Sequence, residues 1–180
     1  MQERPTTMDD VRPEAAAPLG RLEELYVRFA PGGYRLALLL TGSPQAAEDL
    51  VHDAFVQIAG RLGQFRTGLA FDAYLRRTIV NLTKNRWRRA AVVRRHSEQE
   101  TVPSEPVPSM EGMLVERDQI WVAVLSLPPR QRTAIVLRFY EDLPEVEIAA
   151  VMRCRPGTAR SLISRGMASL REELKGDADA

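Results

Sequence analysis

The chain has 180 residues, a formal net charge of +1 and 44% hydrophobic residues, which suits one or two small folded domains and excludes a fully disordered chain. Only 6% of the residues are aromatic, so the cores must be built from aliphatic side chains, which favours helices over a β-sandwich. The single cysteine, Cys154, excludes an internal disulfide framework, and the longest apolar run, residues 36–40, is too short to cross a membrane. Because the N-terminus carries no signal-peptide pattern, we expect a cytoplasmic protein without membrane insertion.

The first half of the chain predicts a small helical domain over residues 19–95, preceded by a disordered tail at 1–18. Pro31-Gly32-Gly33 is expected to interrupt or kink its first helix, because proline lacks a backbone N–H and clashes with the preceding turn. Ser43 before Pro44 forms an N-cap followed by proline at the first helical position, a pattern that begins a helix. The apolar stretches expected to be helical are residues 22–29, 34–40, 44–60 and about 71–93.

A stretch rich in proline and glutamate separates this domain from the rest of the chain. Residues 96–113 contain three prolines and no apolar period, which predicts a flexible acidic linker. Residues 114–175 then predict a second domain, with short helices at about 114–126, 129–140, 145–152 and 156–174. No segment alternates like a strand, so the predicted fold is all-α: two small helical domains joined by a flexible acidic linker, the C-terminal one a helix-turn-helix.

Two parts of the chain combine basic residues with polar ones on one helical face. Between residues 71 and 95 there are eight basic residues and one acid, and between 148 and 171 there are five arginines and no acid. The last two predicted helices have the spacing of a helix-turn-helix, whose second helix enters the major groove of DNA. Both faces therefore indicate contact with nucleic acid, although a cationic face of an ordinary helical bundle is the alternative. Trp87 either stacks on an unpaired base or anchors the rim of the core.

The helix at 44–60 has an acidic face opposite its apolar stripe. Its apolar side is formed by Ala47, Leu50, Val51, Ala54, Phe55 and Ile58. Acids would repel DNA, so the opposite side is expected to face a protein or solvent.

Taken together, these segments resemble extracytoplasmic-function (ECF) sigma factors of the sigma-70 superfamily, and among them the SigE-like branch of actinobacteria. The similarity covers about residues 21–174. The segments that carry it are residues 46–55, 76–89, 127–132, 147–149 and 157–161.

The resemblance implies three sets of contacts. The set that meets the clamp helices of the polymerase's largest subunit is Glu48, Asp49, Asp53 and Gln57. The set that holds the −10 strand is Arg77, Asn81, Lys84, Asn85 and Arg88, beside a loop at 60–70 that traps a flipped base. The set that reads the −35 element is Arg155, Thr158, Arg160, Ser161, Ser164 and Arg165.

The implied function is to bind core RNA polymerase, recognise −35 and −10 promoter elements and promote DNA opening. The implied partners are core polymerase through its clamp helices and flap, promoter DNA and an anti-sigma factor, with no cofactor and no enzymatic activity. The implied location is the cytoplasm, at the nucleoid when polymerase is bound.

Two positions depart from the pattern of the family. Arg155 stands where a serine commonly caps the reading helix, and Leu162 stands where an arginine often contacts phosphate.

The residues by themselves leave two other functions open. One is a stand-alone helix-turn-helix regulator, and the other is an adaptor that binds protein without reading DNA. Neither Cys154, expected to be a small buried turn residue, nor the two histidines form a metal-binding pattern.

Overall fold

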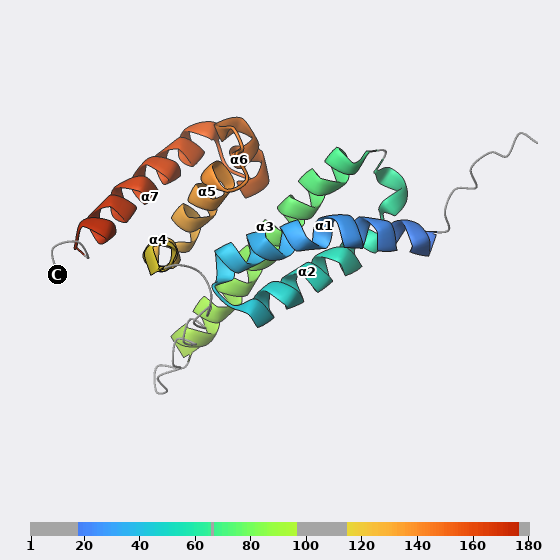
Figure 1. Ribbon diagram of the computed structural model, residues 1–180, viewed down its shortest axis with the longest axis horizontal. Coiled ribbons are helices and arrows are strands. Elements are labelled where there is room, and N and C mark those ends of the chain that lie inside the picture. Colours follow the sequence, from blue (N-terminus) through green and yellow to red (C-terminus); the bar gives the residue numbers. More distant parts are fainter. Residues whose placement is uncertain (1–17, 66, 97–114, 177–180) are drawn as a thin grey trace, which may run out of the picture.

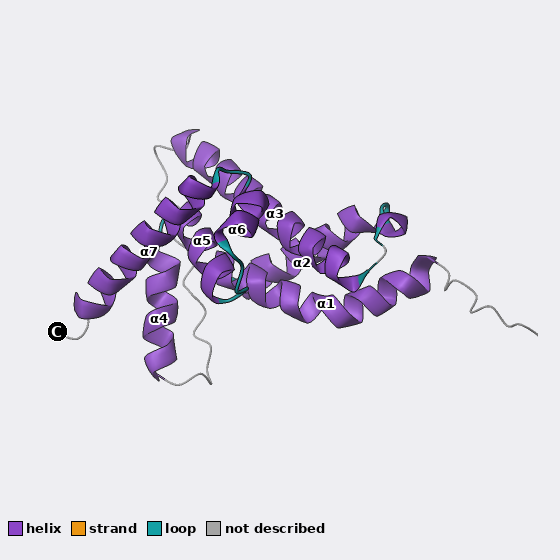
Figure 2. Ribbon diagram, turned by 90° about the horizontal axis from the view of Figure 1, so that it is seen from above, coloured by secondary structure: helices purple, strands orange, loops and turns teal. Residues whose placement is uncertain are grey.

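The computed structural model describes residues 18–65, 67–96 and 115–176. The tail and the linker expected from the sequence lie outside the described residues, except that Pro18 begins a helix and His96 ends one. Within these ranges the secondary structure is helical and no strand occurs (Figure 2). The first half forms α1 (Pro18–Thr41), α2 (Pro44–Ala59), a short 3₁₀ helix η1 (Leu62–Gln64) and α3 (Gly68–His96). The second half forms α4 (Val115–Ser126), α5 (Pro129–Phe139), α6 (Glu145–Met152) and α7 (Pro156–Gly176).

Helix α1 runs from Pro18 to Thr41 through Pro31-Gly32-Gly33, so the sequence does not interrupt the helix, which was one of the two expected outcomes. Pro31 is exposed and removes one helical hydrogen bond, while α1 as a whole packs against α2 and α3. Gly33 is buried, and a Cβ atom there would lie 3.0 Å from Cδ1 of Ile79. The glycine therefore permits a close approach of α1 to α3.

The turn between α1 and α2 follows the sequence prediction. Gly42 has a φ of 73°, the left-handed conformation that ends many helices. The Ser43 side chain accepts a hydrogen bond from the backbone N–H of Ala46 at 3.3 Å, which caps α2. The predicted apolar stripe of α2 is buried throughout.

Helices α6 and α7 form the predicted helix-turn-helix. Arg153 ends α6 with a φ of 52°, and its N–H bonds back to α6 carbonyls, so the chain turns sharply before Pro156 begins α7. Leu162 of α7 is only 5% exposed and belongs to the core. The sequence predicts that a phosphate contact common in the family is missing at this position, and the burial of Leu162 agrees with that.

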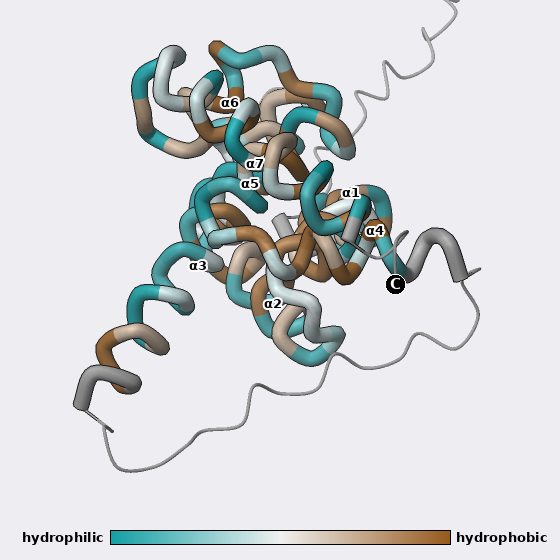
Figure 3. Tube along the Cα trace, turned by 90° about the vertical axis from the view of Figure 1, so that its left-hand side faces the viewer, coloured by the Kyte–Doolittle hydropathy of each residue, from teal (hydrophilic) through white to brown (hydrophobic). Residues whose placement is uncertain are grey.

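The two halves pack side by side, with α5 and α6 lying against α1 and α3 (Figure 1). One cluster of buried residues runs from Phe71 of α3 to Leu137 of α5 and Ile148 of α6. Figure 3 shows the hydrophobic residues concentrated between the helices of the first half. The buried residues of the two halves thus form one continuous core.

Candidate nucleic-acid interface

All five residues predicted to hold the −10 strand line one groove along α3. The groove has a volume of about 590 Å³, and we call it the α3 groove. Its lining residues are Gln57, Arg61, Tyr74, Arg77, Thr78, Asn81, Leu82, Lys84, Asn85, Arg88 and Arg153. The four arginines and one lysine in this lining make the groove strongly cationic, which suits a nucleic-acid backbone.

Two residues of the groove that were not assigned to the −10 strand, Arg61 in the predicted base-trapping loop and Tyr74 after it, are joined by a hydrogen bond. Nη1 of Arg61 donates to the hydroxyl of Tyr74 at 2.7 Å. The Tyr74 ring also packs on Phe65, with ring centroids 5.1 Å apart, and Phe65 contacts Phe71 in turn. These aromatic contacts anchor the described part of the predicted base-trapping loop. The sequence signal for this wall was an arginine inside that loop and a tyrosine shortly after its end.

Trp87 lies at the rim of the core rather than in the α3 groove. It is half-buried and packs against the main core cluster. The guanidinium carbon of Arg132, from α5, lies 5.8 Å from the centroid of its ring, within range of a cation–π contact. The arrangement supports the structural alternative for Trp87 in this conformation.

The residues predicted to read the −35 element lie at and after the start of α7. Arg155, Arg160, Ser161, Ser164 and Arg165 are exposed, and Thr158 is half-buried. Ser161 donates its hydroxyl to the carbonyl of Gly157 at 2.9 Å, so the hydroxyl is engaged within the helix. Nε of Arg165 likewise donates to the carbonyl of Ser161, at 3.2 Å, so that arginine is also engaged along the helix.

One of these arginines is paired with an acid of α6. Nε of Arg160 donates to Oε2 of Glu145 at 2.9 Å, and Nη2 forms an ion pair with the same oxygen, also at 2.9 Å. The hydrogen bond from Arg160 lowers the pKa of the Glu145 carboxyl and raises the pKa of the guanidinium. This pair fixes the direction of Arg160 on the exposed surface.

The predicted docking residues divide between two surfaces. Glu48, Asp49 and Asp53 are exposed on α2, whereas Gln57 lines the α3 groove with the −10 set. Asp49 lies 3.7 Å from Nη1 of Arg86, but both side chains are more than half exposed, so this ion pair is weak. The acidic face of α2 is thus available to a partner.

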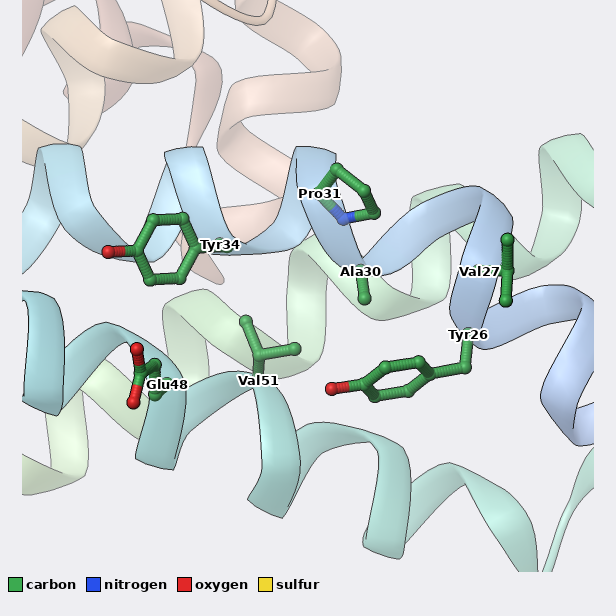
Figure 4. A pocket seen from close by; sticks show the side chains of 7 residues that line it. All are labelled: Tyr26, Val27, Ala30, Pro31, Tyr34, Glu48 and Val51. Carbon is green, nitrogen blue, oxygen red and sulfur yellow. The ribbon is translucent and has the colours of Figure 1, made fainter.

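A mostly apolar groove of about 360 Å³ lies between α1 and α2, at the edge of the acidic face. Figure 4 shows Tyr26, Tyr34 and Val51 between the two helices, with Glu48 at one end. The ring of Tyr26 stacks edge-on against Phe55, with the centroids 4.8 Å apart, and remains 47% exposed. The sequence reading did not find this groove, because it combines residues of two helices.

Other kinds of site were sought over the described ranges. No group of three or more histidine, cysteine, aspartate or glutamate residues there could hold a metal ion. Cys154 is half-buried and packs against the core. In the same residues, no helix is both long and apolar enough to cross a membrane.

Comparison with known proteins gives matches over both halves. Residues 25–92 match the family profile "Sigma-70 region 2" and residues 117–170 match "Sigma-70, region 4". The RNA polymerase sigma-E factor of Streptomyces coelicolor is 33% identical over 152 residues, which cover 84% of this chain and 85% of the relative. The ECF RNA polymerase sigma factor SigE of Mycolicibacterium smegmatis is 32% identical, over 84% of this chain and 61% of the relative.

A solved structure is similar over both halves as well. The sigma factor RpoE from Bartonella quintana, solved in complex with the anti-sigma factor NepR, matches with a TM-score of 0.70 and 25% identity. The match covers 85% of this chain and 96% of that one.

Proposed function

The chain belongs to the ECF sigma factors of the sigma-70 family, which recognise promoters together with RNA polymerase. We propose that its two basic surfaces read two separate promoter elements. The observation that carries this proposal is the gathering of Arg77, Asn81, Lys84, Asn85 and Arg88 in the single α3 groove. Cations mixed with amides suit a strand whose phosphates are held while its bases are read.

The α3 groove takes the single-stranded −10 element in this proposal. Its cationic lining supplies the attraction for phosphates, and Tyr74 offers an aromatic surface at one end. The exposed start of α7 takes the −35 duplex, since Arg160 and Arg165 can reach guanine edges in a major groove. The protein acts by binding rather than by catalysis, at the nucleoid where promoter DNA lies.

Polymerase docking is assigned to the acidic face of α2 together with the apolar groove beside it. Opening a duplex costs roughly 1.4 kcal/mol per base step, which two small basic surfaces on a free protein do not readily offset. When the protein is docked on polymerase, both promoter contacts become intramolecular and gain from effective concentration. Docking is therefore required for the DNA surfaces to work.

Binding by an anti-sigma factor is the remaining part of the proposal. The similar structures of RpoE and CnrH were solved with the anti-sigma factor NepR and with the cytosolic domain of CnrY, respectively. These complexes support an inhibitor of the same class for this chain.

A direct measurement of affinity for core polymerase tests the docking assignment, and run-off transcription shows its effect on promoter use. The double substitution Asp49→Arg and Asp53→Arg should weaken binding to core enzyme at least about tenfold, because it reverses two exposed charges of the docking face. The matched control, Glu172→Arg with Glu173→Arg, makes the same charge change on exposed positions of α7. Equal core affinity for both double variants, with the fold intact by circular dichroism, would show that docking lies elsewhere.

A further inference from the structure

An ion pair joins the two helices of the helix-turn-helix on its exposed surface. Glu145 is the first residue of α6, and Arg160 is the fifth residue of α7. Nε of Arg160 donates to both carboxylate oxygens of Glu145, at 3.2 and 2.9 Å, and Nη2 lies 2.9 Å from Oε2. The carboxylate therefore meets the edge of the guanidinium that carries Nε and Nη2.

The acidic partner of this pair is held in place by its own surroundings. The side chain of Glu145 is 34% exposed, compared with 75% for Arg160. Arg138 of α5 donates from Nη1 to the carbonyl of Leu143 at 3.0 Å, just before α6 begins. The hydrogen bond and charge of Arg160, followed by the charge of Arg138, lower the pKa of the Glu145 carboxyl. Glu145 is thus an ionised acceptor at a defined position, in the first turn of α6 where the helix dipole favours an acid.

The contact leaves one edge of the Arg160 guanidinium free. A guanidinium carries five N–H donors in one plane, and two of its edges can each donate a pair of parallel hydrogen bonds. Within the part of the chain that the structure describes, Nη1 of Arg160 has no hydrogen-bond acceptor. A guanine offers O6 and N7 side by side in the major groove, which matches an edge of this kind. Glu145 therefore sets the plane of the guanidinium without occupying the edge that suits guanine.

The other two arginines assigned to the −35 element have a different environment. Arg165 donates from Nε to a carbonyl of its own helix, and Arg155 is exposed before α7 begins. Among the described residues, neither of them meets a carboxylate. An exposed arginine loses rotamer freedom when it binds, so a guanidinium that is already oriented has less freedom to lose. A fixed plane also makes the guanidinium less able to adapt to a base other than guanine.

We propose that Glu145 is a positioning residue that sets the base preference of Arg160, favouring guanine at one position of the −35 element. The inference rests on the proposed assignment of the start of α7 to that element. Glu145 acts through Arg160 and does not itself touch a base. Because a carboxylate beside DNA also repels phosphates, Glu145 increases discrimination between bases without increasing total affinity.

The orienting effect can be measured in the full-length free protein, without DNA. Nuclear magnetic relaxation of the arginine Nε–H groups reports how well each side chain is ordered. In the unmodified protein the order parameter of Arg160 should exceed that of Arg171, which is exposed on the same helix. Glu145→Ala should lower the order parameter of Arg160 to the level of Arg171. Glu147→Ala removes an acid from the same first turn of α6 and should leave Arg160 ordered.

The base preference is measured on the full chain bound to core polymerase. The probe is a pool of promoter duplexes in which only the −35 element is randomised, and the bound fraction is sequenced. Arg160→Ala identifies the position at which its guanidinium selects guanine. Glu145→Ala should lower the preference for guanine at that same position by about fivefold or more, because a good bidentate contact is worth at least that ratio. Total affinity should be unchanged or higher.

Three further variants make the result specific to the pair. Glu147→Ala is the matched charge control and should keep the preference of the unmodified protein at every position. Glu145→Gln keeps a carbonyl oxygen that can accept from Nε, so it should keep part of the preference that Glu145→Ala loses. In an Arg160→Ala background, adding Glu145→Ala should change the preference no further, because Glu145 then has no guanidinium to orient.

The outcomes separate this inference from the proposed function. Equal order of Arg160 in the unmodified protein and in Glu145→Ala would overturn it, whatever DNA the holoenzyme prefers. A uniform rise in affinity with unchanged base preference would also overturn it, since Glu145 would then only repel DNA. A change in preference that persists in the Arg160→Ala background would mean that Glu145 contacts a base directly. If Arg160→Ala alters no preference, the assignment of α7 to the −35 element fails, and this inference fails with it.

Discussion

At the scale of single residues, Arg160 is the arginine of the α7 surface whose direction is best defined. Its ion pair with Glu145 leaves part of the guanidinium fork free to meet a base edge. We expect Arg160→Ala to weaken binding to a −35 duplex by about 1–3 kcal/mol and to relax sequence preference at one position. Fluorescence anisotropy on matched and mismatched duplexes measures both effects.

The control for this variant is Arg171→Ala, which removes the same charge from an exposed position nearer the end of α7. Its loss should be small and uniform across sequences, as for a general electrostatic effect. If both variants lose the same affinity on every duplex, Arg160 acts only as a phosphate contact.

The same ion pair gives a prediction in pH. The hydrogen bond from Arg160 lowers the pKa of Glu145 in the folded state, so the pair stabilises the fold above the ordinary glutamate pKa of about 4.3. This stabilisation is lost as the pH falls through the depressed pKa, where the carboxyl becomes protonated. Arg160→Ala should return the pKa of Glu145 toward its ordinary value, which a carboxyl-detected NMR titration can follow. An unchanged titration of Glu145 would contradict the pairing seen in the structure.

At the scale of elements, two neighbouring glycines of α1 distinguish the effect of helix propensity on stability from the effect of packing. A Cβ at Gly32 would meet nothing within 4 Å, so Gly32→Ala should stabilise the protein by up to about 1 kcal/mol. A Cβ at Gly33 would press on the fully buried Ile79, so overpacking should offset the same gain. We expect Gly33→Ala to be less stable than Gly32→Ala by about 1 kcal/mol or more, as measured by urea denaturation. Equal free energies of unfolding would show that α3 yields without cost.

Most elements could be predicted from the sequence because proline and glycine mark their ends. Pro44, Pro129 and Pro156 each begin a helix, and Gly42 ends one in the conformation expected of it. The interruption expected at Pro31 does not occur, because the packing of α1 on two other helices outweighs the one hydrogen bond that the proline removes. Helix propensity therefore predicts the ends of a helix well where tertiary packing is weak, and it predicts them poorly where a helix packs against other helices.

At the scale of the whole molecule, the polar faces could be predicted, but the packing of the halves could not. The five residues assigned to the −10 strand recur at helical spacing, so their shared groove follows from the period alone. The contacts of Arg132 with Leu40 and Trp87 join residues far apart in the sequence, and no local period signals them. The apolar groove between α1 and α2 was missed for the same reason.

The shared core predicts how the free protein unfolds. Buried residues of both halves form one cluster, and the Arg76–Glu141 pair adds a shielded contact across it, so the halves should lose structure together. We expect a single calorimetric transition, with a ratio of calorimetric to van't Hoff enthalpy near one. Glu141→Arg should split this into two transitions, because an unfavourable charge placed at the interface uncouples halves that each retain a core of their own. Glu172→Arg provides the matched charge change and should keep one transition. Two transitions in the unmodified protein would mean that the interface contributes too little free energy to couple the halves.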